Sequence, residues 1–152
     1  MLRFLSFLAF GLIPFVTEEK RKRELINLFG KARTSITIIE DHDLDEAFYN
    51  DERIIAVLKQ AINRGVAIQI VYHPSIKNRL LNVSILRIPG VKVFTTDELL
   101  NRGVMIVDEK DVVVEAMHAS GEKRIPTVIK RNDPSLAKAF RLAFKTLISA
   151  QI

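Results

Sequence analysis

The side chains that could act in catalysis are few and lie in short polar stretches of the chain. Histidine occurs three times, at His42, His73 and His118, and cysteine is absent. The lack of cysteine excludes disulfides, thiolate nucleophiles and cysteine-ligated zinc. Because an imidazole can act as a nucleophile or base near neutral pH, the three histidines are the first candidates for chemistry.

The acidic segment EDHDLDE, residues 40–46, places five carboxylates around His42. Asp41, His42 and Asp43 could together bind a divalent cation, since carboxylate oxygens and imidazole nitrogens are common metal ligands. The spacing matches no calcium loop or zinc motif, and acidic loops are usually solvated. We therefore expect neither a metal nor another cofactor.

A second polar stretch, SGEKR at residues 120–124, follows His118. With Arg102 it could form a rim that binds anions, although an ordinary exposed turn explains it equally well. His118 also has two interpretations. It is a displaced nucleophile or base, or, as we favour, a polar residue at the end of a strand. The candidate ligand-binding residues are Arg102, His118, Ser120, Lys123 and Arg124.

Length and composition indicate one globular domain with a net positive charge. Of the 152 residues, 48% are hydrophobic and 27% charged, and the net charge is +5. Such a charge favours nucleic acid, a phosphate-bearing ligand or an anionic membrane as partner, although a basic domain without such a partner fits equally well. The densest basic run, Lys20–Arg23, is expected on the exposed face of a helix, without aromatic residues for base stacking. The composition also suits a thermophile.

The first 16 residues, MLRFLSFLAFGLIPFV, are apolar apart from Arg3 and Ser6. They have a poor signal-peptide cleavage site, and Pro14 leaves too short a helix to span a bilayer, which takes about 20 residues. We expect residues 1–16 to pack on the domain or a partner subunit, with membrane anchoring as the less favoured alternative. Residues 17–152 then form the domain, and the expected location is cytoplasmic, or membrane-associated if the segment is an anchor.

Hydrophobic periodicity predicts alternating helices and strands, and this order implies an α/β fold with a mixed β-sheet flanked by helices on both faces. Gly103–Asp108 and Val112–Met117 are too close in sequence to be joined as parallel strands, so they form an antiparallel hairpin. The core face of the last helix is Leu136, Phe140, Ala143, Phe144, Leu147 and Ile148. The expected elements are a helix capped by Thr17, a strand at 35–40, a helix from Asn50 to Gly65, a strand at 66–74, a strand near 91–95, the hairpin, a strand at 127–130 and a helix from Asp133–Pro134.

Four segments in this order resemble one half of the phospholipase D superfamily, over about residues 17–150. They are ELINLFGKARTSITIIED, ERIIAVLKQAINRGVAIQIVYHP, GVMIVDEKDVVVEAM and RNDPSLAKAFRLAFKTLI. The resemblance implies the fold of one such half. Because single-half members pair across their catalytic face, it also implies a homodimer.

The family's chemistry needs the motif H-x-K-x4-D, in which histidine attacks phosphorus and lysine holds the phosphate oxygens. Aligned on VMIVD, the aspartate is Asp108, whereas the histidine position is Asn101 and the lysine position Gly103. The family's Gly-Ser-x-Asn element falls on Glu115 to His118, and its downstream glutamate falls on Arg124. The resemblance therefore implies a degenerate motif with no catalytic residue, in which Asp108 is compatible with a structural role.

Three functions remain open at the level of sequence. The favoured one is a catalytically inactive domain that binds a ligand, phosphate or nucleic acid and dimerises, similar in kind to degenerate domains of archaeal sugar-responsive transcription regulators. The second is a phosphodiesterase or nuclease that uses non-standard residues such as His118. The third is a membrane-attached subunit, with residues 1–16 as anchor and Lys20–Arg23 on anionic headgroups.

Overall fold

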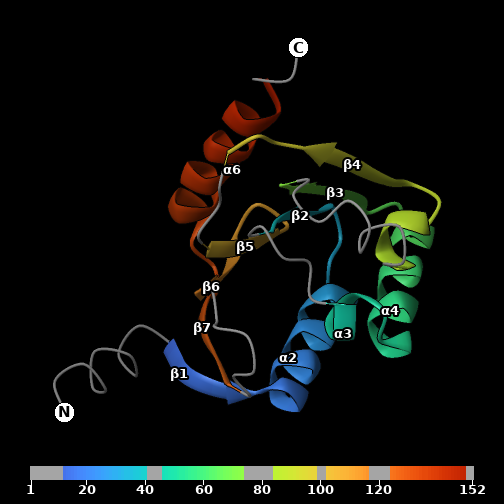
Figure 1. Cartoon of the computed structure of the whole chain (residues 1–152), viewed down its shortest axis with the longest axis vertical. Helices are drawn as coiled ribbons and strands as arrows, with labels where there is room; N and C mark the ends of the chain where they lie inside the picture. Colours follow the sequence, from blue (N-terminus) through green and yellow to red (C-terminus); the bar gives the residue numbers. More distant parts are fainter. Residues whose placement is uncertain (1–11, 41–45, 74–83, 99–101, 117–123, 150–152) are drawn as a thin grey trace, which may run out of the picture.

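A seven-stranded mixed sheet forms the centre of the molecule. The computed structural model describes residues 12–40, 46–73, 84–98, 102–116 and 124–149. The strand order is β1-β7-β6-β5-β2-β3-β4 (Figure 1). Strands β2, β3 and β4 are parallel, and each other neighbouring pair is antiparallel. The strands are β1 (Leu12–Thr17), β2 (Ser35–Ile39), β3 (Ala67–Tyr72), β4 (Val91–Thr95), β5 (Arg102–Val107), β6 (Asp111–Ala116) and β7 (Arg124–Lys130).

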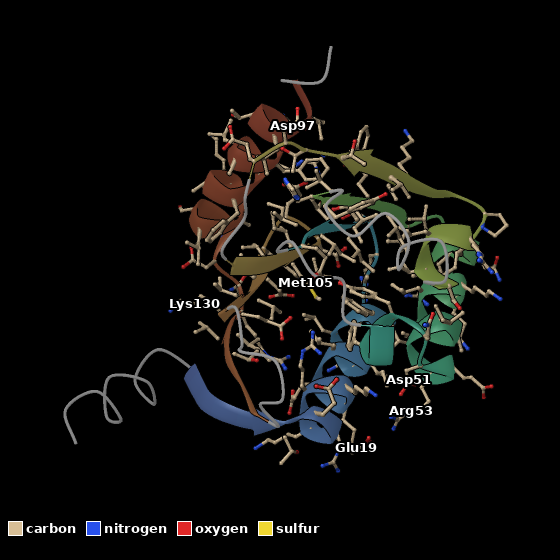
Figure 2. All side chains as sticks on the ribbon, in the orientation of Figure 1. Glu19, Asp51, Arg53, Asp97, Met105 and Lys130 are labelled. Carbon is tan, nitrogen blue, oxygen red and sulfur yellow. The ribbon has the colours of Figure 1, made fainter. Side chains whose placement is uncertain are left out.

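Helices cover both faces of the sheet, as the sequence predicted. One face carries α2 (Glu18–Gly30), α3 (Glu46–Tyr49) and α4 (Glu52–Asn63), and the other carries α6 (Pro134–Ser149) (Figure 1). Alternate residues of β2 supply the two cores, because successive side chains of a strand point to opposite faces. Ile36 and Ile38 pack in the core under α2 and α4, and Ile39 packs in the core under α6. Figure 2 shows Met105, which belongs to the first core, deep inside the molecule.

Polar side chains fix where the helices begin. The Thr17 hydroxyl accepts a hydrogen bond from the Lys20 amide at 3.2 Å, so the predicted cap of α2 is confirmed. The prediction that Asn50 caps α4 is wrong. Asp51 is the cap, because the extra helical turn α3 reaches Tyr49, and Asn50 instead accepts a hydrogen bond from the Ser84 amide at 2.7 Å.

The β5–β6 hairpin is present as predicted, with Gly103 opposite Glu115 and Val107 opposite Asp111. The last helix also begins as expected, since the Asp133 carboxylate accepts a hydrogen bond from the amide of Leu136 at 3.1 Å. Five of the six residues predicted for its core face do pack in the core: Leu136, Phe140, Phe144, Leu147 and Ile148. Ala143 is exposed, and Ala137, which was not predicted, is buried instead.

The remaining elements lie at the edges of the sheet. Strand β1 pairs antiparallel with β7, which begins three residues earlier than predicted, at Arg124. A 3-10 helix, η2 (Ser84–Arg87), leads into β4 at the opposite edge. Of the helices that the structure describes, none is long and apolar enough to cross a membrane.

Candidate functional site

Gly103, at which the sequence resemblance places the family's lysine, lies near the start of β5, where the neighbouring strands β2 and β6 end. Gly103 pairs with Glu115, and Glu115 pairs in turn with Thr127 on β7. Glu40 follows directly after β2, whose last residue Ile39 pairs with Val104. We call the group Glu40, Gly103, Glu115 and Thr127 the motif edge. Strand alternation directs these positions to the face of the sheet that α2 and α3 cover.

Gly103, the position of the family's lysine, contributes no cation to this edge. A Cβ placed there would meet Glu115 Cβ at 3.8 Å and the Ile39 carbonyl oxygen at 3.9 Å, which are ordinary contacts. The backbone therefore has room for a Cβ at this position. The glycine removes the positive charge, while the neighbouring Glu115 adds a negative one.

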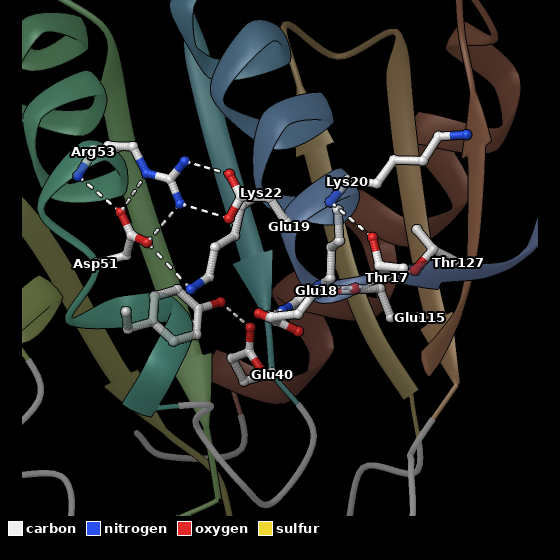
Figure 3. A network of polar contacts seen from close by, with 12 residues as sticks. Thr17, Glu18, Glu19, Lys20, Lys22, Glu40, Asp51, Arg53, Glu115 and Thr127 are labelled. Carbon is white, nitrogen blue, oxygen red and sulfur yellow. Dashed lines mark hydrogen bonds and ion pairs between the residues drawn. The ribbon is translucent and has the colours of Figure 1, made fainter. Parts of the chain in front are cut away.

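Arg21 of α2 neutralises Glu115 in a buried ion pair. Both side chains are less than a tenth exposed. The guanidinium donates through Nε and Nη2 to the two carboxylate oxygens, the second bond measuring 3.0 Å, and Thr127 Oγ1 donates to the same carboxylate at 3.4 Å. Nη1 donates to Glu18 at 3.1 Å, and the guanidinium lies 4.3 Å from the centre of the Phe48 ring. Figure 3 shows Glu18, Glu115 and Thr127 of this network.

Arg21 stays protonated in this buried network. Burial by itself would lower the pKa of Arg21, but the adjacent Glu115 carboxylate outweighs this effect, so the pKa is raised. The guanidinium therefore stays positive, with donors directed at Glu115 and Glu18. An arginine held in this way supports the fold at the motif edge.

A second buried pair joins Glu40 to α3. The Tyr49 hydroxyl, fully buried, donates a hydrogen bond to Glu40 (Figure 3). Burial raises the pKa of Tyr49 well above its ordinary value, and the Glu40 carboxylate raises it further. Tyr49 therefore remains a hydrogen-bond donor and does not act as a base. Within the described residues, the two carboxylates of the motif edge are thus both bonded to buried partners, Glu115 to Arg21 and Glu40 to Tyr49.

Asp108, the retained motif residue, lies at the other end of β5 and organises a turn. Its carboxylate accepts hydrogen bonds from the amides of Arg33 (2.9 Å), Thr34 (2.8 Å) and Ser35 (3.2 Å). Burial opposes ionisation, but these donors outweigh it and lower the pKa of Asp108. Asp108 and Glu109 have φ values of 55° and 58°, so both adopt the left-handed conformation of the hairpin turn. The geometry of Asp108 is that of a structural residue.

The other predicted site residues are only partly described. Asn101, His118, Ser120 and Lys123 lie outside the described residues, as do Asp41, His42 and Asp43 of the acidic segment. Arg102 and Arg124 begin β5 and β7, where they pair with Ala116 and Thr17 respectively. These two arginines therefore lie on strands separated by β6. Within the described residues, no group of three or more acidic or histidine side chains could hold a metal ion.

The sequence reasoning missed Arg21, Glu40 and Tyr49, and it placed the whole run Lys20–Arg23 on an exposed face. Lys20 and Arg23 are exposed, but Arg21 is buried and Lys22 pairs with Asp51 at 3.1 Å. The available signal was helical spacing, since Arg21 lies four and seven residues before the buried Leu25 and Leu28. A charged residue on an apolar stripe needs a buried partner, which here is Glu115.

Comparison with known proteins supports the fold. No known family profile matches the chain, and no curated protein matches it. Among solved structures, NucT from Helicobacter pylori is similar with a TM-score of 0.64 at 18% identity, over 89% of this chain and 94% of that chain. Nuc from Salmonella typhimurium, described as a phospholipase D family member, has a TM-score of 0.59 at 20% identity, over 82% and 85%.

A third similar structure is TrmBL2, an archaeal chromatin protein described as showing a novel mode of DNA binding. Its TM-score is 0.63 at 16% identity, over 87% of this chain. The chain spans only half the length of TrmBL2. Identities this low establish the fold and nothing finer. This chain has the fold of the phospholipase D superfamily.

Proposed function

We propose that the chain is a catalytically inactive phospholipase D-like domain that works as a binding and dimerisation module. The observation that carries this proposal is the motif edge, where Gly103 replaces the lysine and faces the Glu115–Arg21 ion pair. Phosphoryl transfer needs a nucleophile together with a cation that neutralises the charge developing on the phosphate oxygens. Gly103 beside the Glu115 carboxylate supplies neither such a nucleophile nor such a cation to a phosphate.

The ligand class that we propose is anionic, with nucleic acid as the first candidate. The net charge of +5 favours polyanions, and a protein of similar fold, TrmBL2, is described as binding DNA. Electrostatic attraction of this kind needs no base-specific contact. It predicts binding that weakens steeply with salt and depends little on sequence.

The dimer is the second part of the proposal and rests on the resemblance to single-half members of the superfamily. A symmetric pair would use the same surface of both subunits. Light scattering coupled to size exclusion should give a mass of about twice 17.3 kDa. A monomer at all concentrations would remove dimerisation from the proposal and leave the binding function in place.

The test of inactivity combines cleavage and binding on one preparation. The full chain is incubated with a generic phosphodiester, single-stranded DNA and double-stranded DNA, with and without divalent cations. We expect no turnover above the buffer rate, together with binding of DNA at low salt. Cleavage that disappears in His118→Ala would contradict the proposal and establish the alternative, a phosphodiesterase that uses non-standard residues.

A further inference from the structure

Four turns lie together at the ends of the strands that are farthest from the motif edge. They are residues 31–35, 64–66, 108–111 and 131–133, and we call them together the turn edge. The Asp108 carboxylate binds the amides of the first turn, and the Ala67 amide donates to the Thr34 carbonyl at 3.0 Å. The Asp133 amide donates to the Lys110 carbonyl at 2.6 Å. These hydrogen bonds connect all four turns.

The charges that reach solvent at the turn edge are mostly positive. Its acidic side chains are engaged locally: Asp108 by the first turn, Asp111 by the Asn132 amide at 2.8 Å, and Asp133 by the amide of Leu136. The fourth, Glu109, is about half exposed and lies 3.5 Å from Arg141. The turn edge also carries five exposed cationic residues, which outnumber its four acidic ones: Lys31, Arg33, Arg64, Lys110 and Arg131.

The side chains of three of the five cations have no bonding partner among the described residues. Within the described residues, the side chains of Lys31, Arg33 and Lys110 form no hydrogen bond or ion pair. By contrast, Arg64 donates to the carbonyls of Phe29 and Ala32 at 3.2 and 3.0 Å, so it also stabilises the end of α2.

Helix dipoles explain only part of this cluster. Lys31 and Arg64 follow the C-termini of α2 and α4, where cations are favourable. Arg131 lies three residues before the first residue of α6 and pairs with Glu24 of α2 at 3.5 Å, whereas Arg33 and Lys110 lie in turns beyond any helix end. Within the described residues, helix dipoles and internal contacts therefore account for Lys31, Arg64 and Arg131 but not for Arg33 and Lys110.

We infer that the turn edge binds the phosphate backbone of double-stranded nucleic acid. Its turns contain no aromatic residue, so they lack the stacking surface that single strands use. Among described residues, the exposed large hydrophobic side chains are Val93 and Leu142, and neither belongs to the turn edge, which argues against insertion into a membrane. The inference rests on the nucleic-acid part of the proposed function and assigns it to the edge opposite the motif edge.

The experiment compares two triple variants that remove the same charge from different places. One carries Lys31→Ser, Arg33→Ser and Lys110→Ser. The matched control carries Lys59→Ser, Lys92→Ser and Lys138→Ser, which are exposed positions on α4, β4 and α6. Binding of a labelled duplex of about 20 base pairs is followed by fluorescence anisotropy at several salt concentrations. Thermal unfolding of each variant verifies that it is folded.

We expect the turn-edge variant to bind about tenfold or more weakly at low salt, with a slope of log K against log salt about 2 to 3 units shallower. The control should keep a slope close to that of the wild type. Equal losses in both variants would overturn the inference but leave nucleic-acid binding intact. No duplex binding by the wild type would overturn both. Binding to phosphatidylserine vesicles that depends on the three residues, without duplex binding, would assign the edge to membranes and also overturn the inference.

Discussion

At the scale of single residues, the charges beside Gly103 at the motif edge are buried and paired. Arg21 and Glu115 come from different elements and are buried together, so each depends on the other. A buried charge is tolerated only when it is paired and hydrogen-bonded. The pair thus ties α2 to the sheet at the place where the superfamily's lysine would meet phosphate.

Breaking this pair should be costly. Glu115→Gln leaves the Arg21 guanidinium buried against a neutral amide, and we expect the free energy of unfolding to fall by about 3 kcal/mol. Arg21→Met combined with Glu115→Leu removes both charges and should lose clearly less. Urea unfolding of the three proteins gives these values. A double variant less stable than Glu115→Gln would show that the pair contributes more than charge compensation.

Asp108 provides a prediction with a defined pH dependence. Asp108→Asn keeps a residue that tolerates positive φ but removes the charge that the three amides stabilise, at a cost of about 1–2 kcal/mol near neutral pH. Because folding lowers the pKa of Asp108, its contribution is complete above the unfolded-state pKa of about 3.9 and is lost as pH falls through the folded value. The difference between wild type and variant should therefore shrink below about pH 4. A difference that stays constant to lower pH would exclude the charge as its cause.

At the scale of elements, Arg141 connects α6 to the sheet. Its Nη1 donates to Thr37 Oγ1 at 2.7 Å and to Gln69 Oε1 at 3.1 Å, and Thr37 is buried. Arg141→Met would leave these two polar groups without their charged donor, so we expect a loss of about 1–3 kcal/mol. Hydrogen exchange should accelerate most in α6. Leu142→Ala, at the adjacent and mostly exposed position, is the control and should change little.

Elements with strong periodicity were predictable from the sequence. The hairpin, the strands β2 and β3 and the cap at Asp133 all follow from patterns within about 15 residues. The helix α3 was not, because a helix of four residues has no detectable period and its aromatic residues, Phe48 and Tyr49, serve a distant core. The cap of α4 shifted from Asn50 to Asp51 for the same reason.

At the scale of the whole molecule, the sequence predicted which residues occupy the motif positions but not the contacts that surround them. The alignment of Gly103 with the lysine position follows from local sequence, whereas the Glu115–Arg21 contact joins residues 94 positions apart. No pattern along the chain selects that pairing, since it depends on how α2 packs over β6 and β7. The same holds for the turn edge, whose cations come from four separate turns and meet only when the sheet forms.

Whether residues 1–16 are part of the folded domain is also a question about the whole molecule, and truncation tests it. Leu12–Thr17 forms the edge strand β1, so a chain lacking residues 1–16 loses one of the two strands that pair with β7 while keeping β6 and the cap of α2 at Thr17. An uncovered strand edge invites pairing with other chains. We expect this variant to aggregate or to lose about 2 kcal/mol or more of stability.

A chain lacking only residues 1–11 keeps β1 and is the matched control. If the function of residues 1–16 is packing through this strand, the shorter truncation should unfold at the same urea concentration as the full chain, and neither protein should float with anionic vesicles. Flotation of the full chain that is lost on removal of residues 1–11 would establish the membrane anchor instead. Equal stability of both truncations would mean that β7 does not need its edge partner, and the domain would then begin at α2.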